Sequence, residues 1–117
     1  MAEIHLIQKP MTRVELRKIA VERYGDLVKG VVDIKLEIMA LGGEFHSEEE
    51  TFLIEKRGSK REDTWGINLY PDKPKEEMME FDSVINIKPS SGNRSRNVEK
   101  QEIKEKIKGI VYNLISD

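Results

Sequence analysis

Val28-Lys-Gly-Val-Val-Asp-Ile-Lys-Leu-Glu-Ile-Met-Ala40 is the stretch that decides the fold. Its even positions are apolar at Val28, Val32, Ile34, Leu36, Ile38 and Ala40. Charged residues occupy odd positions, which is the period of two that a β-strand produces and a helix does not. One strand over the whole stretch would exceed the usual ~5–6 residues. A hairpin that turns near Lys35-Leu-Glu37 is therefore the competing interpretation, although no Gly or Asn marks the turn.

Three further stretches have the character of strands. Residues 3–9 are rich in aliphatic side chains and end at Pro10, which cannot donate to a β-ladder. Residues 64–70 alternate apolar side chains with smaller or polar ones before Pro71. Residues 78–88 are predicted to return beside them as the second strand of an antiparallel hairpin. The apolar residues that share one phase in this return strand are Phe81, Ile85 and Ile87.

Three helices are predicted, at 13–24, 48–57 and 99–116. Thr12-Arg-Val-Glu15 and Ser47-Glu-Glu-Glu50 have the spacing of capping boxes at the start of the first two helices. The third helix has a wide apolar stripe formed by Ile103, Ile107, Ile110, Val111, Leu114 and Ile115. Together, the strands and helices predict an α+β fold with a mainly antiparallel sheet of four or five strands. The helices are expected to cover mainly one face of this sheet, with the C-terminal helix packed there.

The composition places residues 1–117 in a single globular domain. A net charge of -2 provides no general field for nucleic acid, so extended nucleic acid is not an expected partner. The absence of cysteine excludes disulfides and thiolate metal sites. No apolar run reaches the ~20 residues of a membrane span, and Met1-Ala-Glu-Ile-His5 lacks the pattern of a signal peptide. We therefore expect a cytoplasmic protein with no membrane partner. The abundance of Glu and Lys is also a trait of heat-adapted proteins.

Three segments carry a resemblance to a known family. They are Gly42-Gly-Glu-Phe-His-Ser-Glu-Glu-Glu50, Gly58-Ser-Lys-Arg-Glu-Asp-Thr-Trp-Gly66, and Ile85-Asn-Ile-Lys-Pro89 with Asn93-Arg-Ser95. In these segments, and over nearly the whole chain, the sequence resembles a family of small bacterial and archaeal proteins described only as a domain of unknown function. The family pattern commonly has a Gly where this chain has Lys35 to Glu37, which favours the hairpin, and an Asp-Pro pair where it has Lys100-Gln101. The resemblance implies no activity.

The loop Pro89-Ser-Ser-Gly-Asn-Arg-Ser-Arg96 is the first candidate site. Arginine side chains match phosphate and carboxylate groups, and backbone N–H groups near a helix N-terminus attract anions. The candidate ligand-binding residues are Ser90, Ser91, Asn93, Arg94, Ser95 and Arg96. Arg94 ranks first because it lies in the triplet that resembles the family pattern. The competing interpretation is a polar loop whose arginines pair with nearby acids, and the loop lacks the Gly spacing and Lys of a P-loop.

His46 is the candidate catalytic residue, since an imidazole suits acid and base chemistry near neutral pH. Neighbouring acids could make a metal site with it: Glu48, Glu49 and Glu50. The helix dipole and the capping box explain the same acids without a metal. No HxH or HExxH spacing is present, so neither a metal nor a cofactor is predicted.

Two further groups of residues have a structural and a functional interpretation. Trp65 and Tyr70 could form an aromatic surface for bases, but their opposite phases place Trp65 in the core instead. Three acids form a shared carboxylate site only if their elements converge, and are otherwise turn and strand-face residues. These acids are Asp33, Asp63 and Asp82.

The candidate residues leave two function classes and one structural alternative. The first is a binding module for a phosphate-containing small molecule or nucleotide, held by Arg94, Arg96 and the backbone of loop 89–96. The second is a small enzyme of metal-assisted hydrolysis or phosphoryl chemistry that uses His46 with Arg94. The third is a homodimer whose loops are only structural. His46 and Arg94 in one pocket would favour the enzyme, whereas separate faces would favour the binding module.

Overall fold

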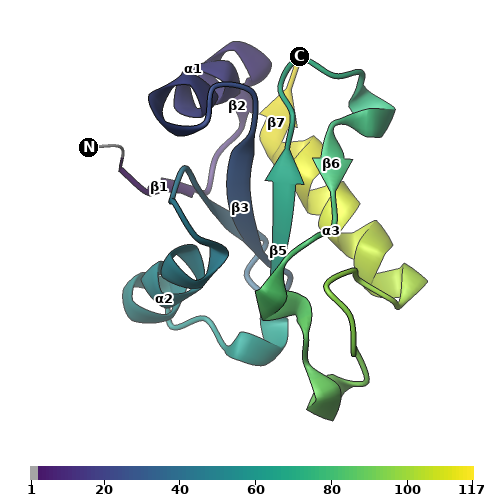
Figure 1. Ribbon diagram of the computed structural model, residues 1–117. Helices are drawn as coiled ribbons and strands as arrows, with labels where there is room; N and C mark the ends of the chain where they lie inside the picture. Colours follow the sequence, from purple (N-terminus) through teal and green to yellow (C-terminus); the bar gives the residue numbers. More distant parts are fainter. Residues whose placement is uncertain (1–2) are drawn as a thin grey trace.

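The computed structural model describes residues 3–117 and has an α+β fold, which confirms the predicted class (Figure 1). A sheet of five antiparallel strands has the order β1-β4-β3-β5-β6. These strands are β1 (His5–Ile7), β3 (Val28–Asp33), β4 (Ile38–Leu41), β5 (Thr64–Leu69) and β6 (Met79–Glu80). A separate parallel pair joins β2 (Met11–Thr12) to β7 (Ile115–Ser116), so the segment just before α1 lies beside the last residues of the chain.

The period-two stretch forms a hairpin, not one strand. β3 and β4 pair with Asp33 opposite Ile38. The Asp33 carboxylate accepts hydrogen bonds from the backbone N–H groups of Lys35 and Leu36, at 2.8 and 2.9 Å. Glu37 then adopts a left-handed φ of 58°. The turn forms without Gly or Asn because an aspartate side chain supplies the acceptor that closes it.

The first and third helices begin and end close to their predicted positions. The first, α1 (Arg13–Arg23), has the predicted capping box, in which Thr12 and Glu15 exchange hydrogen bonds. The third is α3 (Gln101–Leu114). Short 3-10 helices connect other elements at Arg61–Asp63, Lys75–Glu77, Val84–Asn86 and Pro89–Ser91. Among residues 3–117, every helix is too short or too polar to cross a bilayer.

The second helix, α2 (His46–Arg57), begins earlier than predicted, and the capping box expected at residues 47–50 is wrong. Glu48 accepts a hydrogen bond from the backbone N–H of Phe45, at 3.0 Å, so the acid that folds back on the helix start is Glu48. Glu50 is therefore not part of the cap, and its carboxylate contacts Arg61 and Thr64 instead. Gly58 ends the helix with a left-handed φ of 70°, as expected for a glycine cap.

Helices cover both faces of the sheet, which corrects the prediction of one covered face (Figure 1). Alternate residues of β3, β4 and β5 pack with α1 and α3 in the larger core. The other face of the sheet carries a small apolar cluster in which Leu53 of α2 packs with Val31, Ile38 and Ala40. The C-terminal helix packs on one face, as predicted.

The predicted return strand 78–88 is wrong beyond Glu80. After β6 the chain forms two 3-10 turns, and the Asn86 side chain takes the place of a strand beside Gly66. Its Oδ1 accepts the Gly66 N–H at 2.7 Å, and its Nδ2 donates to the Gly66 carbonyl at 3.0 Å. Gly66 also lets this segment approach, because a Cβ there would lie 2.5 Å from the side chain of Ser83.

Candidate functional site

Two neighbouring cavities lie where the start of α2 meets the segment 83–96. The smaller one, which we call the arginine cavity, has a volume of about 250 Å³ and is lined by Lys29, Phe45, His46, Ser47, Ser83, Val84, Ile85 and Arg96. The larger one, which we call the lysine cavity, has a volume of about 470 Å³ and is lined by Ser47, Glu50, Arg61, Glu62, Ile85, Ile87, Lys88, Pro89, Ser90 and Ser91. Ser47 and Ile85 line both cavities, so the two adjoin.

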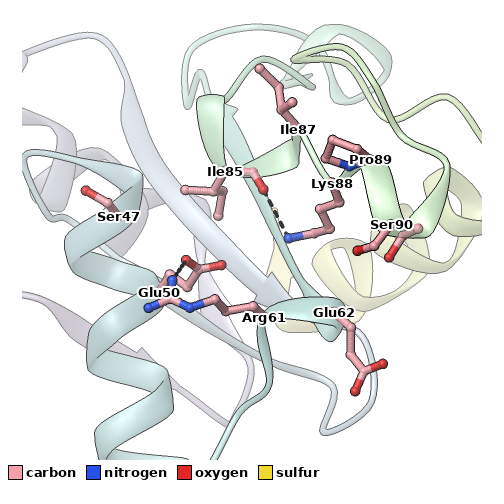
Figure 2. Close-up of a pocket in the computed structure, with 10 residues that line it drawn as sticks. Ser47, Glu50, Arg61, Glu62, Ile85, Ile87, Lys88, Pro89 and Ser90 are labelled. Atoms are coloured by element: carbon pink, nitrogen blue, oxygen red, sulfur yellow. Dashed lines mark hydrogen bonds and ion pairs between the residues drawn. The ribbon is translucent and has the colours of Figure 1, made fainter.

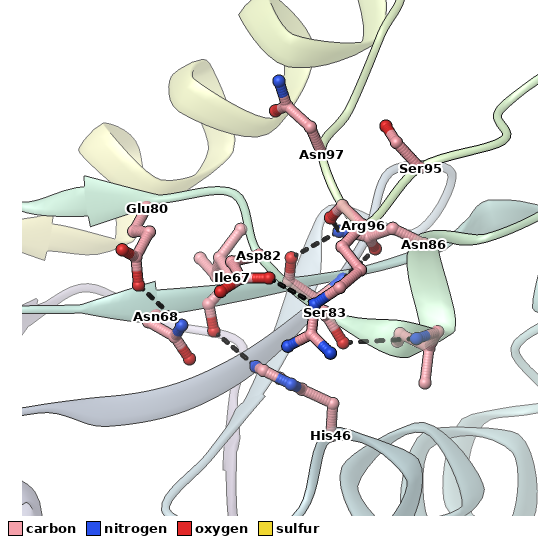
Figure 3. Close-up of polar contacts among 12 residues, drawn as sticks. His46, Ile67, Asn68, Glu80, Asp82, Ser83, Asn86, Ser95, Arg96 and Asn97 are labelled. Carbon is pink, nitrogen blue, oxygen red and sulfur yellow. Dashed lines mark hydrogen bonds and ion pairs between the residues drawn. The ribbon is translucent and has the colours of Figure 1, made fainter.

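Buried asparagines hold the backbone that carries Arg96 (Figure 3). The Arg96 carbonyl accepts hydrogen bonds from Asn86 Nδ2 at 3.0 Å and from the Ser83 N–H at 3.1 Å. Asn86 is fully buried, and its other bonds attach it to Gly66 on β5. The backbone of Arg96 is therefore held in position through Asn86 by strand β5, and not by the loop alone.

Two cations from distant parts of the chain line the arginine cavity. Arg96 Nε donates to Asp82 Oδ1 at 2.6 Å, and both side chains are about half exposed. Lys29 comes from β3, on the face of the sheet that α2 covers. Its ammonium also lies 5.7 Å from the centre of the Tyr24 ring. This cavity therefore has two positive side chains, one of which has a carboxylate partner.

His46 is buried in the arginine cavity. Its Nε2 lies 2.8 Å from the Ile67 carbonyl oxygen, which can only accept, so Nε2 carries the proton (Figure 3). Burial lowers the pKa of His46 below its usual 6.5, while the hydrogen bond to Ile67 opposes that shift. The neutral ring then has Nδ1 unprotonated, which makes it a hydrogen-bond acceptor or a proton acceptor.

The structure divides the six loop residues that the sequence singled out. Arg96 lines the arginine cavity, and Ser90 and Ser91 line the lysine cavity. Arg94 is exposed and lines neither cavity, and its backbone N–H donates to Glu99 Oε2 at 2.9 Å. His46 therefore shares a cavity with Arg96 and not with Arg94.

Asn93 and Ser95 form contacts inside the loop. Asn93 is buried, and its Nδ2 donates to the carbonyls of Asn86, Asn97 and Ser95 at 2.8, 2.7 and 3.1 Å. Its Oδ1 accepts the Glu99 N–H at 2.8 Å. A hydrogen bond from the Ser95 side chain, supported by the Arg94 N–H, lowers the pKa of Glu99. Both residues therefore hold the shape of the loop.

The acids after His46 have separate contacts. Glu49 is fully buried and accepts the Gly43 N–H at 2.8 Å; burial holds the pKa of its carboxyl well above 4.5. Glu50 is buried too, with Oε1 at 2.7 Å from Arg61 Nη1 and Oε2 at 2.5 Å from Thr64 Oγ1. Within residues 3–117, no three His, Cys, Asp or Glu side chains lie together as metal ligands would.

The remaining sequence candidates have structural contacts. Trp65 is buried in the larger core, as predicted, whereas the Tyr70 hydroxyl donates to Glu80 Oε1 at 3.0 Å. Asp33 closes the β3–β4 turn and Asp82 pairs with Arg96.

Lys88 is a site residue that sequence reasoning did not identify (Figure 2). Its Nζ donates to the Ile85 carbonyl at 3.0 Å and lies 5.0 Å from the centre of the Trp65 ring. Burial lowers the pKa of Lys88, and the charge of Glu50 opposes that shift. The residue stands directly before the loop, but a single lysine in a strand-like run gives no signal that its side chain turns inward. The alternation that contains Lys29 likewise gives no signal that this side chain lines a cavity.

The chain belongs to the family described as protein of unknown function (DUF5674), whose profile matches residues 5–114. This finding confirms the resemblance noted in the sequence. No curated protein and no solved structure matches the chain.

Proposed function

We propose that the protein binds a small phosphate-containing ligand in the arginine cavity. The observation that supports this most is the meeting of two cations from distant elements, Lys29 of β3 and Arg96 of the loop, in one cavity of about 250 Å³. Such a volume is near the lower end of small-molecule pockets and suits a phosphate group or a mononucleotide phosphate more than a long polymer. The proposed site includes part of the loop 89–96 and is centred on Arg96 instead of Arg94.

The contacts of Arg96 leave it able to hold a phosphate. Asp82 occupies Nε, so the two terminal amino groups of the guanidinium can still donate to phosphate oxygens. In Figure 3 the guanidinium points toward the His46 ring. The Asp82 carboxylate also orients the side chain, which reduces the entropy lost on binding.

His46 and Ser47 supply the neutral polar groups of the same cavity. The Nδ1 atom of neutral His46 can accept a hydrogen bond from a protonated phosphate oxygen, and the Ser47 hydroxyl can donate one. Both residues lie in the first turn of α2, where partial positive charge from the helix dipole favours an anion. Ser90 and Ser91 lie beyond Ile85 in the adjoining cavity, where they could meet the rest of a larger ligand.

The test is a calorimetric titration of inorganic phosphate and AMP into wild type and two variants. Arg96→Ala should weaken binding by about 10-fold or more, because charge-assisted hydrogen bonds contribute roughly 1.5–3 kcal/mol. Arg94→Ala is the matched control, since it removes the same side chain from the same loop outside the cavity. The proposal is wrong if wild type binds neither ligand below millimolar, or if both variants bind equally well.

A second candidate is a phosphate-ester hydrolase that uses His46 as its general base. The observation that favours it is a buried imidazole, whose pKa burial lowers, in the same cavity as an arginine. His46→Asn should then abolish hydrolysis of p-nitrophenyl phosphate while phosphate still binds. If wild type binds phosphate but hydrolyses no ester, the binding module remains and the enzyme does not.

A further inference from the structure

The lysine cavity holds an amine that lies against an aromatic ring and shares the cavity with acidic side chains. Lys88 is half-buried, and its Nζ lies over the indole of Trp65, a side chain that is only 1% exposed. The Ile85 carbonyl accepts one of its hydrogen bonds at 3.0 Å. Glu50 lines the same cavity, with its carboxylate held by Arg61 and Thr64.

We propose that Lys88 is a reactive amine that captures a small aldehyde or ketone as an imine in the lysine cavity. This site is distinct from the arginine cavity and does not depend on phosphate binding. The open volume of about 470 Å³ gives a small carbonyl compound access to the amine.

The backbone fixes the position from which the Lys88 side chain starts. The Lys88 N–H donates to the Asn93 carbonyl at 2.7 Å, and the Lys88 carbonyl accepts from the N–H groups of Ser91 and Asn93 at 2.9 and 3.1 Å. Asn93 is itself buried and held by the loop. The amine is thus presented from a rigid segment, which favours a reaction that needs a defined direction of attack.

The reaction needs no oxidant, reductant or metal. The nitrogen lone pair of neutral Lys88 attacks the carbonyl carbon and forms a C–N bond, which gives a carbinolamine. The oxygen then leaves as water, taking both hydrogens of the original amine, and a C=N bond remains. Water in the open cavity can relay the proton between nitrogen and oxygen, and Glu50 is a carboxylate of the same cavity lining.

The surroundings increase the neutral fraction of this amine relative to an exposed lysine. Burial is the main cause and lowers the pKa of Lys88, while the charge of Glu50 acts against it. Arg61 adds to the lowering and Asp63 opposes it. Glu62 is the other charged side chain that lines the cavity. A desolvated lysine is the usual form of an imine-forming amine in proteins.

The test is site-resolved labelling of the whole wild-type chain with acetaldehyde and cyanoborohydride, read by peptide mass spectrometry. At pH 7 Lys88 should be alkylated on the order of 10-fold faster than Lys104, as expected of an amine activated by burial. Lys104 is the matched control, because its Nζ also lies over an aromatic ring, 5.1 Å from the centre of Phe81, but lines neither cavity. The difference in labelling rate should narrow at pH 10, because an alkaline solution deprotonates exposed lysines as well and so reduces the advantage that burial gives Lys88.

Two outcomes would overturn the proposal. The first is that Lys88 is labelled no faster than Lys104 at pH 7, and the second is that the difference between their labelling rates is the same at pH 10 as at pH 7. Lys88→Arg should lose the dominant label with an unchanged melting temperature, whereas Arg96→Ala should keep it. A protein that labels Lys88 but binds no phosphate would leave this inference intact and refute the proposed function. A protein that binds phosphate but shows no selective labelling of Lys88 would refute this inference and leave the proposed function intact.

Discussion

The two faces of the five-stranded sheet are covered in different ways. On one face, α1 and α3 pack aliphatic side chains against alternate residues of β3, β4 and β5. On the other, a small apolar cluster around Leu53 is surrounded by buried polar side chains. These include His46, Glu49, Glu50, Thr64, Asn68, Ser83 and Asn86. Both candidate cavities lie on this polar face.

The difference between the two faces indicates where a small domain can form a binding site. Apolar contacts have no preferred direction, so the α1 and α3 face can be filled completely by side chains of suitable volume. Hydrogen bonds require defined distances and angles, so the polar side chains hold the segment 83–96 at a fixed position above the sheet. The cavities lie between this segment and α2, and they are lined by the groups that are able to meet a ligand.

Replacing Asn86 by Ala should strongly destabilise the polar face. The Gly66 N–H and carbonyl would both lose their partner in a buried place, at a cost of about 1–3 kcal/mol each, or ~2–6 kcal/mol in total. Chemical denaturation measures this loss, with Asn113→Ala, an exposed asparagine of α3, as the control. Since Asn86 also holds the Arg96 carbonyl, the variant should lose phosphate affinity as well. A loss below ~0.5 kcal/mol would mean that the polar face is not held by this side chain.

Replacing Ile107 by Ala probes the apolar face. The side chain is fully buried among the α1 and α3 contacts, so we expect a loss of about 2–5 kcal/mol in the free energy of unfolding. Phosphate affinity should stay unchanged, because no cavity residue is touched. Val21→Ala, at an exposed position of α1, is the control. If Ile107→Ala weakened phosphate binding as strongly as Asn86→Ala, the two faces would not be independent.

The smallest expected effect is a pH dependence at Glu49. Burial raises the pKa of this carboxyl, so its contribution to stability is full below pH 4.5 and is lost as the pH rises through the pKa of the folded protein. Glu49→Gln keeps an acceptor for the Gly43 N–H but cannot ionise. The melting temperature of the variant should therefore rise relative to wild type as the pH increases from 4 toward 9. If the melting temperatures of wild type and Glu49→Gln changed with pH in the same way, this prediction would be wrong. The control is Glu55→Gln, an exposed change on α2, whose melting temperature should follow that of wild type at every pH.

Much of the secondary structure was readable from neighbouring residues alone. The Thr12–Glu15 capping box and the apolar stripe of α3 involve contacts within one or two turns of a helix, so their spacing predicts them. The period-two stretch predicted β-structure but did not distinguish one long strand from a hairpin. The Asp33 side chain settled that choice through bonds to Lys35 and Leu36, which a search for Gly or Asn does not detect.

The segment after Glu80 shows where local patterns failed. Phe81, Ile85 and Ile87 have the spacing of a strand, yet Ile87 is exposed and the chain turns twice. The reason is the pair of bonds from Asn86 to Gly66, twenty residues earlier in the chain. A side-chain amide can replace a strand partner only when the fold brings the two together, and periodicity contains no such information.

The sequence by itself determined the α+β class, the family, and the loop that carries Arg96. Only the tertiary structure decided which side chains meet there. Lys29 and His46 join Arg96 because β3, the start of α2 and the loop are packed on one face of the sheet, while Arg94, two positions away, lies outside the cavity. The physical reason is range: backbone preferences and side-chain periodicity act over a few residues, whereas a cavity depends on contacts between segments separated by tens of residues.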